Sequence, residues 1–449
     1  MARSLRRSPL FLAFALVAAG PLACAVRAQQ VRVETALDHA VLLANQKQTA
    51  YLRTALTGFD LPGQSVRAPL NVAIVIDKSG SMQGQKIEQA KAAARAALSQ
   101  LRDEDIVSIV AYDDTVEVLV PATKVSDRAT IDRGIGRLTA GGMTALFAGV
   151  VKGSAEVRKF ISRERVNRVV LLSDGAANVG PVSAAELGQL GRNLRKDGIA
   201  VTTVGLGRGY NEDLMVQLAQ ASGGQHVFIE DERQLATVFR EGFGNLASIV
   251  AKEVVVKIHL AEGIRPVRVL GRAVETVEIV GQDVTVQMPA LYARQTDDLV
   301  LELEVRALPP QNLKVATVDV SYHNIATRGA DKVSMSLGAE LTDDRERASR
   351  SEVPAVRVAV LERIANEKSR QAIELRDQGR VDDARRLLED NARALRDGAA
   401  RYDSDTLDKL SKQYDFDADN IEGESWNKQR KVIQRRNVQS PYQLEQNNF

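Results

Sequence analysis

Hard oxygen ligands gather in the segment Asn71–Met82, which reads NVAIVIDKSGSM. The β-branched run Val72–Ile76 is typical of a strand buried on both faces of a parallel sheet, and open α/β sheets place ligand sites at the carboxyl ends of such strands. Asp77, Ser79 and Ser81 follow this strand directly. One carboxylate and two hydroxyls favour Mg²⁺, Ca²⁺ or Mn²⁺ over Zn²⁺ or copper. By itself, this segment also allows a polar turn whose serines cap the next helix.

Two later segments offer the same kind of ligand. The sequence GGMT ends at Thr144, just before a predicted helix, and Asp174 follows the apolar run Arg168–Leu172. If these strands are neighbours, the loops meet at one edge of the sheet, because parallel strands end on the same edge. The sequence therefore predicts a divalent-metal site made of two carboxylates and three hydroxyls: Asp77, Ser79, Ser81, Thr144 and Asp174.

Strands and helices alternate from Asn71 to about Glu253, which predicts a doubly wound parallel sheet of the α/β class with helices on both faces. The expected strands are Val72–Ile76, Asp105–Ala111, Thr115–Val120, Arg168–Leu172, Ala200–Val204 and His226–Ile229. The expected helices are Lys86–Leu101, Ser126–Arg137 capped by Ser126, Leu146–Phe160, Ser183–Lys196 with a capping box, Asn211 to about Gly223, and Asp231–Val250.

Strands of another kind flank this region. From Val254 to Leu337 the apolar residues alternate with period two, most clearly in Val300–Arg306, which predicts antiparallel strands. Residues 31–69 also resemble strands but have no sheet of their own. We expect residues 31–69 and 252–338 to form one β-sandwich, with an α/β domain at 70–251 inserted in it. The alternative is a separate N-terminal hairpin.

The C-terminal part is helical and then polar. Residues 345–413 predict a helical hairpin broken at Gly379, similar in outline to one tetratricopeptide-type repeat. Packing of this hairpin on the β domain is favoured over peptide binding. Residues 414–449 predict a polar, basic, partly disordered tail, with contact to anionic lipid or envelope polymer as the alternative. Its basic residues are Lys428, Arg430, Lys431, Arg435 and Arg436.

The N-terminus predicts export. Three arginines precede the apolar stretch Leu10–Ala19, and Val26-Arg27-Ala28 offers a cleavage site, so residues 1–28 are expected to be a signal peptide. The mature protein then lies outside the cytoplasm, in a periplasm or at the cell surface. A retained anchor and lipidation at Cys24 are the alternatives, and either one would attach the protein to a membrane. Cys24 is the only cysteine, so no disulfide supports the rest of the chain.

Composition and motifs exclude several functions. A net charge of +2 and 4% aromatic residues give no case for nucleic-acid binding. The chain has no G-x-S-x-G elbow with a matching histidine and no complete dinucleotide fingerprint. The predicted metal site has no neighbouring candidate for a general base, so we expect no enzyme activity; a metal-assisted hydrolase is a third hypothesis.

Three motifs together resemble a von Willebrand factor type A domain over about residues 70–250. They are DKSGSM, the threonine after GGM, and SDGAANVG. The first is similar to the DxSxS signature of the metal-ion-dependent adhesion site (MIDAS) of that Rossmann-like family. The five residues matching the family's metal site are Asp77, Ser79, Ser81, Thr144 and Asp174.

The wider arrangement is similar to bacterial proteins grouped with calcium-activated chloride channel proteins and inter-α-trypsin inhibitor heavy chains. No pore-forming segment and no HExxH motif accompany this similarity.

The resemblance implies an exported, metal-dependent protein-binding module for adhesion or scaffolding. An Asp or Glu of a partner protein would complete the coordination of the cation, with Mg²⁺ expected and Ca²⁺ or Mn²⁺ as alternatives. A second hypothesis is a cell-envelope scaffold that binds through its β-sandwich and helical hairpin, with a metal that only stabilises a loop.

Overall fold

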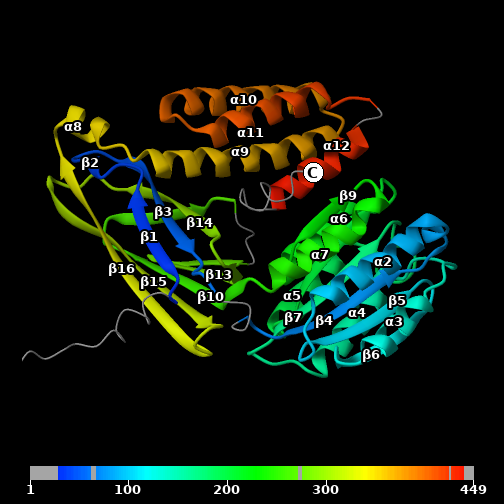
Figure 1. Ribbon diagram of the computed structural model, residues 1–449. Coiled ribbons are helices and arrows are strands. Elements are labelled where there is room, and N and C mark those ends of the chain that lie inside the picture. Colours follow the sequence, from blue (N-terminus) through cyan, green and yellow to red (C-terminus); the bar gives the residue numbers. More distant parts are fainter. Residues whose placement is uncertain (1–28, 62–66, 272–275, 424–425, 439–449) are drawn as a thin grey trace, which may run out of the picture.

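The computed structural model describes residues 29–61, 67–271, 276–423 and 426–438. Three sheets and a group of C-terminal helices make up the molecule (Figure 1). The predicted signal peptide, with Cys24, and the end of the predicted tail lie outside the described residues. Within the described ranges, no helix combines the length and apolar composition needed to cross a membrane.

The α/β part is a six-stranded sheet in the order β6-β5-β4-β7-β8-β9. Only β6 pairs antiparallel with its neighbour; the other pairs are parallel. The strands are β4 (Leu70–Asp77), β5 (Ile106–Tyr112), β6 (Val116–Lys124), β7 (Val166–Ser173), β8 (Ala200–Leu206) and β9 (His226–Ile229). The helices are η2 (Gly80–Met82), α2 (Gln85–Gln100), α3 (Arg128–Gly136), α4 (Leu146–Arg158), α5 (Ala184–Lys196), α6 (Glu212–Ser222), η3 (Glu232–Gln234) and α7 (Leu235–Leu246).

Helices cover both faces of this sheet, as the alternation of elements predicted. Every residue of β4 is buried. Val72, Ile74 and Ile76 pack with α2, α3 and α7 in one core, whereas Ala73 and Val75 pack with α4, α5 and α6 in the other. A strand with cores on both sides favours apolar residues at successive positions, which explains the continuous apolar run Val72–Ile76.

The helix ends confirm two of the three predicted N-terminal caps. Ser183 and Glu186 form the capping box of α5, and the side chain of Asn211 accepts hydrogen bonds at the start of α6. The predicted cap Ser126 is wrong: Asp127 caps α3, because its carboxylate accepts from the backbone N–H of Thr130.

The last helix of the α/β part is shorter than predicted. It ends at Leu246, and residues from Ile249 onward are already in strand β10. The β-branched run from Val254 to Val256 continues that strand, so the apolar residues at 249–251 serve a sheet and not the helix.

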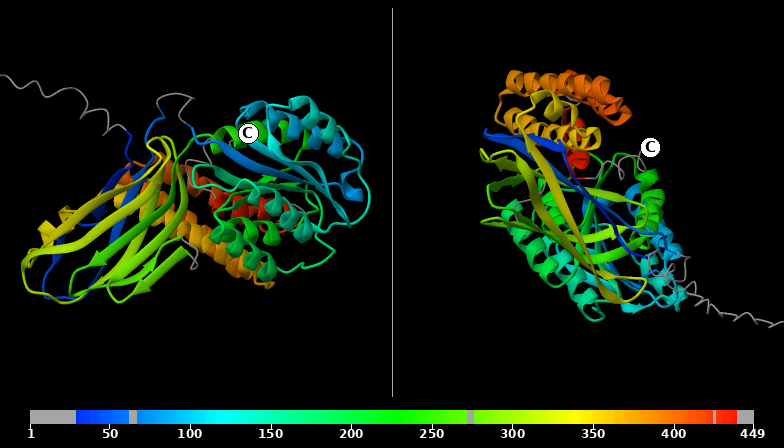
Figure 2. Two further views of the ribbon diagram at one scale, coloured as in Figure 1. Left: turned by 90° about the horizontal axis from the view of Figure 1, so that it is seen from below. Right: turned by 90° about the vertical axis from the view of Figure 1, so that its left-hand side faces the viewer.

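Two sheets form the predicted sandwich, with the α/β part inserted between β3 and β10 (Figure 2). The first sheet contains β1 (Arg32–Leu37), β3 (Gln48–Thr57), β14 (Thr296–Val305) and β11 (Ile264–Val269). The second contains β12 (Val277–Val280), β13 (Asp283–Tyr292), β10 (Ile249–Leu260), β15 (Gln311–Asn324), β16 (Gly329–Thr342) and β2 (Val41–Leu43). Because β3 pairs with β14, the N-terminal strands are part of this sandwich and not a separate hairpin. One pair departs from the antiparallel expectation: β2 runs parallel to β16.

The C-terminal region has more helices than the predicted hairpin. It contains α8 (Arg345–Arg350), α9 (Pro354–Asp377), α10 (Val381–Tyr402), α11 (Asp405–Asp419) and α12 (Trp426–Val438). The hairpin of α9 and α10 turns at Gly379, whose φ is +81°. Helix α9 packs on the sandwich through Val356 and Val360, which contact Val300 of β14. This packing is the alternative that was favoured over a peptide-binding repeat.

The prediction of a partly disordered basic tail is wrong for residues 414–419, which continue helix α11, and it is also wrong for residues 426–438. Residues 426–438 form α12, which lies between α9 and the α/β part (Figure 1). Trp426 and Ile433 are buried in the core shared with α9, α10 and α11. Four of the five basic side chains of α12 pair with carboxylates of this same chain: Lys428, Arg430, Lys431 and Arg436.

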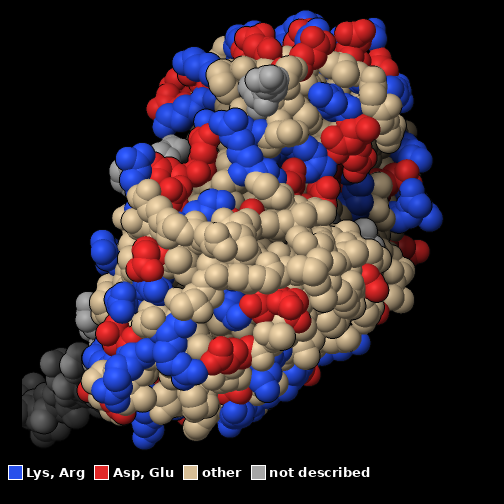
Figure 3. Space-filling view, turned by 90° about the vertical axis from the view of Figure 1, so that its right-hand side faces the viewer, with Lys and Arg blue, Asp and Glu red and all other residues tan. Residues whose placement is uncertain are grey.

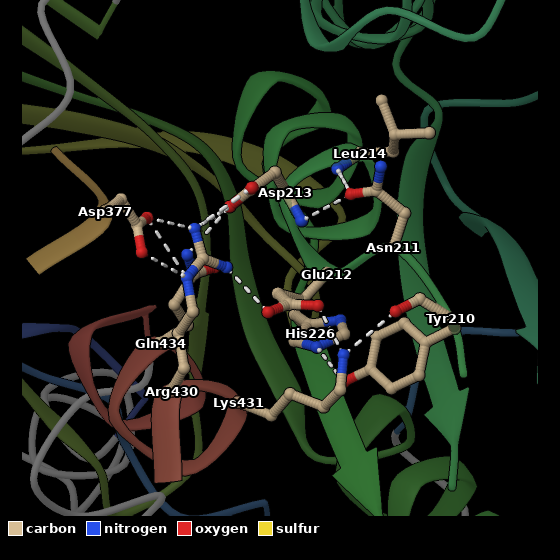
Figure 4. A network of polar contacts seen from close by, with 10 residues as sticks. All are labelled: Tyr210, Asn211, Glu212, Asp213, Leu214, His226, Asp377, Arg430, Lys431 and Gln434. Carbon is tan, nitrogen blue, oxygen red and sulfur yellow. Dashed lines mark hydrogen bonds and ion pairs between the residues drawn. The ribbon is translucent and has the colours of Figure 1, made fainter. Parts of the chain in front are cut away.

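Arg430 and Lys431 join α12 to the α/β part through ion pairs (Figure 4). Arg430 pairs with Asp377 of α9 and with Glu212 and Asp213 at the start of α6. Acidic side chains in the first turn of α6 lie at the positive end of its dipole, where their charge is favourable.

Lys431 is buried and contacts Glu212 on one side and Tyr210 on the other (Figure 4). Its Nζ donates a 2.8 Å hydrogen bond to the carbonyl oxygen of Tyr210 and lies 4.1 Å from the centre of the Tyr210 ring. The Tyr210 hydroxyl is 3.1 Å from Nε2 of His226, which is also fully buried. The C-terminal helix is thereby held to the loop that follows β8.

Candidate metal centre

The candidate metal centre lies where the strand order reverses. Strand β4 is flanked by β5 on one side and by β7 on the other, so the connections that follow β4 and β7 diverge from this point. Open α/β sheets bind ligands in the crevice outside the strand ends at such a switch point. Asp77 is the last residue of β4, and Asp174 follows the last residue of β7.

Asp77 is fully buried and surrounded by neutral donors. Its Oδ1 accepts from the backbone N–H of Ser79 at 2.8 Å, and its Oδ2 accepts from the hydroxyls of Ser173 at 2.7 Å and Tyr112 at 3.4 Å. Burial raises the pKa of Asp77, and the hydrogen bonds from Ser79 and Ser173 oppose that rise. These hydrogen bonds fix the orientation of the Asp77 carboxylate. All of their donors are neutral, so none of them supplies a positive charge to balance it.

Ser79, Ser81 and Asp174 form a connected chain of oxygens. The hydroxyl of Ser81 donates to Oδ1 of Asp174 at 2.6 Å. The Ser79 hydroxyl is 3.1 Å from that of Ser81 and is the donor of this pair, because the Ser81 proton is already used. Lys86, in the first turn of α2, pairs with the other oxygen of Asp174. Three of the five predicted ligands are thus linked by two contacts, one within the loop after β4 and one between the loops that follow β4 and β7.

Thr144 reaches the same place from the loop before α4. A Cβ atom at Gly175 would lie 3.3 Å from the Ser81 hydroxyl and 3.6 Å from the Thr144 hydroxyl, so both hydroxyls flank this glycine. The Thr144 backbone N–H donates to Oδ1 of Asn178 at 2.8 Å, and the Thr144 carbonyl accepts from the N–H of Asn178 at 3.1 Å. This two-way pairing fixes Thr144 against the loop that carries Asp174.

Glycines let the loops approach one another. Gly142 has φ of +78°, and a Cβ there would lie 2.2 Å from a carboxylate oxygen of Asp114. The carbonyl of Gly142 accepts from the N–H of Gly80 at 3.0 Å, and the N–H of Gly141 donates to the carbonyl of Lys78 at 2.7 Å. The loop before Thr144 is therefore bonded along its backbone to the Asp77 loop, and the positive φ of Gly142 disfavours any residue with a side chain there.

A separate ion pair supports the outer side of the Asp77 loop. Lys78 pairs with Asp113, whose carboxylate also accepts from the N–H and the hydroxyl of Thr115 at 2.8 Å each. Burial acts to raise the pKa of Asp113, but the bonds from Lys78 and Thr115 outweigh it and lower that pKa. Although Lys78 follows Asp77 directly in the chain, its ammonium pairs with the carboxylate of Asp113 and not with that of Asp77.

The donor set fits a hard divalent cation. No group of three or more His, Cys, Asp or Glu side chains in the described part of the chain is placed to hold a metal. A site here therefore depends on hydroxyl oxygens beside two carboxylates, which suits Mg²⁺ or Ca²⁺ and does not suit Zn²⁺ bound by thiolate or imidazole.

Four residues of this centre were not among the sequence predictions. Tyr112 and Ser173 orient Asp77, Lys86 pairs with Asp174, and Asn178 holds Thr144. Ser173 and Asn178 lie within the motif SDGAANVG and could have been found there as polar side chains close to Asp174, a hydroxyl donor and an amide whose oxygen accepts. Tyr112 lies 35 positions from Asp77, and only the pairing of β4 with β5 brings it near.

Comparisons with known proteins agree with this geometry. The family model of the von Willebrand factor type A domain matches residues 71–241. Uncharacterized protein sll0103 of Synechocystis sp. is 29% identical over 280 residues, which cover 60% of this chain and 66% of that protein. Human inter-α-trypsin inhibitor heavy chain H3 is 29% identical over 167 residues, covering 35% of this chain and 18% of that one. The chain thus spans less than two thirds of the length of each relative.

The fold is shared with a solved structure over most of the chain. A von Willebrand factor type A protein from Catenulispora acidiphila aligns with a TM-score of 0.67 and 19% sequence identity, over 85% of this chain and 90% of that one. The coverage extends beyond residues 71–241, so the flanking sheets are part of the shared fold. From the family match and the doubly wound sheet, we conclude that the chain carries a von Willebrand factor type A domain at residues 71–241, and this part is similar to a segment of the inter-α-trypsin inhibitor heavy chains.

Proposed function

We propose that this protein is a metal-dependent protein-binding module in which an Asp or Glu of a partner completes the coordination of a divalent cation. Von Willebrand factor type A domains commonly bind a divalent metal and mostly mediate protein–protein interactions, not catalysis. The observation that carries the proposal is the buried Asp77 carboxylate, which is surrounded by neutral donors at the switch point of the sheet. The residues that would hold the cation are Asp77, Ser79, Ser81, Thr144 and Asp174.

We propose Mg²⁺ as the cation, with Ca²⁺ and Mn²⁺ as substitutes. The candidate ligands are oxygens only, and the loops that carry them are bonded to each other along the backbone. Mg²⁺ keeps part of its water shell and takes few protein ligands, which leaves positions for a partner's carboxylate. Lys86 already meets one oxygen of Asp174, so it limits how far that carboxylate turns toward a cation.

The surface on this side suits contact with a protein. In the right-hand view of the molecule, charged side chains crowd over the C-terminal helices, whereas a broad band below them has few charges (Figure 3). Met143, next to Thr144 in the chain, is 51% exposed. We propose that the partner presents its carboxylate among apolar side chains, because a weakly charged rim leaves the cation as the main attraction for a carboxylate.

The test is capture of a partner by the mature chain from envelope extract. It is run with Mg²⁺, with EDTA, and with the variants Asp77→Ala and Asp132→Ala. Asp132 is an exposed carboxylate on α3 that pairs with Arg95, so its variant controls for loss of one negative charge. We expect capture by the wild type and by Asp132→Ala only when Mg²⁺ is present, and no capture by Asp77→Ala. Capture that persists in EDTA or in Asp77→Ala contradicts the proposal.

A scaffold that binds through its C-terminal helices is the second candidate. It is favoured by Phe416 of α11, which is 55% exposed. Deleting residues 345–449 would uncover the sandwich face under α9, so the substitution Phe416→Ser is a cleaner test. Loss of capture in Phe416→Ser with full capture in EDTA would favour the scaffold.

We also propose that the protein works outside the cytoplasm. The support is the basic and apolar N-terminal sequence before Gln29. Cell fractionation of the full chain and of a Cys24→Ala variant tests this location. Release of both into the soluble extracytoplasmic fraction supports cleavage, whereas membrane retention that requires Cys24 supports lipidation.

A further inference from the structure

A cavity of about 610 Å³ lies at the edge of the α/β sheet opposite to the metal centre. It is lined by the first residues of β7 and β8, by the end of α5, and by β10 and β13 of the sandwich. These strands meet where the α/β part joins the sandwich (Figure 1). The volume is in the range of pockets that bind small molecules.

Positive charge dominates the lining of this cavity. Its acidic side chains are Asp197 and Glu253, and both already pair with arginines, Arg158 and Arg163 respectively. Its basic side chains are Arg163, Arg165, Arg168, Arg195, Lys196 and Lys252. Six cations against two paired carboxylates leave an excess of four positive charges in the wall.

Arg168 is the buried arginine among the residues that line the cavity. It belongs to β7, and only 3% of its surface is exposed. Among the residues that the structure describes, no hydrogen-bond partner reaches its buried Nε, and its Nη1 is 3.5 Å from the Thr202 hydroxyl, at the limit of a hydrogen bond. No carboxylate of the described residues pairs with this buried guanidinium, which is costly, and an anion bound in the cavity that Arg168 lines would supply the missing negative charge.

Lys252 adds a fixed charge to the same wall. Its Nζ donates to the carbonyl oxygens of Arg163 and of Arg165, the latter at 2.6 Å. Burial lowers the pKa of Lys252 to about 8, so the ammonium still carries its proton at neutral pH. Through these bonds Lys252 holds the segment that contributes Arg163 and Arg165 to the cavity wall.

We propose that this cavity binds a small molecule that carries two or more phosphoryl groups. Each phosphate monoester carries a charge of about −1.5 to −2, so two such groups match the excess charge in a compact volume. Guanidinium groups present planar, paired donors that suit phosphate oxygens. Apolar side chains such as Ile249 and Pro289 also line the cavity and offer contact to an organic part of the ligand.

Isothermal titration calorimetry with inorganic pyrophosphate in EDTA tests the proposal. We expect saturable binding that weakens with added salt and is at least tenfold weaker in Arg168→Met and in Lys196→Met. Arg137→Met is the matched control, because Arg137 is an exposed arginine that pairs with Glu117 far from the cavity. Its affinity should equal that of the wild type. Asp77→Ala should also bind normally, which separates this site from the metal centre.

Two further probes determine the ligand class. Inorganic phosphate should bind at least tenfold more weakly than pyrophosphate, and citrate, which carries similar charge on carboxylates, should bind weakly as well. The absence of saturable binding, equal affinity in Lys196→Met, or citrate binding as tight as pyrophosphate would each overturn the proposal. Lys196 is exposed at the end of α5, so its variant gives a result even if Arg168→Met fails to fold.

Discussion

Two buried aspartates, Asp77 and Asp417, show opposite ways of placing a carboxylate inside this protein. Both are fully buried. Asp417 of α11 pairs with the buried Arg436 of α12 and accepts a hydrogen bond from Gln429. The guanidinium of Arg436 also lies 4.6 Å from the centre of the Tyr414 ring. Among the residues that the structure describes, Asp77 accepts only from hydroxyls and a backbone N–H.

The difference lies in where the compensating charge comes from. Arg436 neutralises Asp417 within the chain, so that carboxylate serves to join two helices. Near Asp77 the two lysines pair with other carboxylates, Lys78 with Asp113 and Lys86 with Asp174. A buried charge that meets only dipoles is stabilised by a cation from outside, whereas one with a guanidinium partner is not. Four predictions test this distinction.

The largest effect is expected from Arg436→Met. Removing the guanidinium leaves Asp417 buried without its cation, which should lower the free energy of unfolding of the helical region by about 3–5 kcal/mol. Urea unfolding followed by the fluorescence of Trp426 measures this, because Trp426 is the only tryptophan and is buried at the start of α12. The double variant Asp417→Asn with Arg436→Met should recover much of the loss. A loss below 1 kcal/mol would show that the pair is not what holds α12.

A pH effect of about 3 kcal/mol over two pH units is expected from His226. Burial, with Lys431 and Arg435 nearby, lowers the pKa of His226 to about 3, from about 6.5 in an unfolded chain. Below pH 6.5 the unfolded chain binds a proton that the folded chain refuses, so stability falls as pH decreases, by at most about 1.4 kcal/mol per pH unit.

The measurement for His226 is the difference in unfolding free energy between wild type and His226→Gln from pH 7 to 4. Glutamine keeps an acceptor for the Tyr210 hydroxyl and a donor for Thr203, so its stability should decline less steeply with acid. Parallel pH profiles for the two proteins would contradict the assignment. This group shows a third way of burying a titratable side chain, in which it stays neutral.

A smaller effect is expected from Asp77→Asn, which removes a buried charge, whereas Arg436→Met removes the cation that balances one. In EDTA the variant should be as stable as the wild type or more stable by about 1 kcal/mol, because a buried charge without a cation is removed. With Mg²⁺ at a hundred times its Kd, the wild type should gain about 2.7 kcal/mol and the variant nothing. Thermal unfolding followed by circular dichroism measures both. A destabilised variant in EDTA would show that Asp77, like Asp417, is compensated within the chain.

The smallest effect is expected from Ser81→Ala, which removes the hydroxyl between Ser79 and Asp174. We expect Mg²⁺ affinity to fall at least tenfold, which corresponds to about 1.4 kcal/mol. Stability in EDTA should change by only about 1 kcal/mol, the usual contribution of one hydrogen bond. Calorimetric titration with Mg²⁺ measures the affinity, and Ser99→Ala, on the exposed end of α2, is the control. Unchanged affinity would remove Ser81 from the ligand set.

The α/β fold could be predicted from local pattern because each of its elements has a strong local signal. The unbroken apolar run of β4 indicates a strand covered on both faces, and the capping residues Ser183 and Asn211 mark helix starts within three positions. The boundary at Leu246 could not be predicted in this way, because apolar residues of helix α7 continue directly into apolar residues of strand β10.

The candidate metal centre also contains residues that local sequence could predict and residues that it could not. The two serines lie within four residues of Asp77, so their proximity follows from chain length alone. The hydroxyls of Tyr112 and Ser173 reach Asp77 across 35 and 96 positions, and only strand pairing brings them there. The prediction that the basic residues of α12 belong to a disordered tail was wrong for the same reason: the carboxylates on α6 that pair with Arg430 are more than 200 positions away.

By itself, the sequence determined the strand–helix alternation, the positions of the candidate residues Asp77 and Asp174 at strand ends, and the insertion of the α/β part between strands of the sandwich. These features depend on hydrophobic period and on residues that are neighbours in the chain. The tertiary structure alone decided which charges are neutralised inside the molecule: Arg436 at Asp417, Lys431 at Glu212, and no cation at Asp77 among the described residues. A charge can be neutralised by any opposite charge that the fold brings within a few ångströms, and sequence separation does not limit that choice.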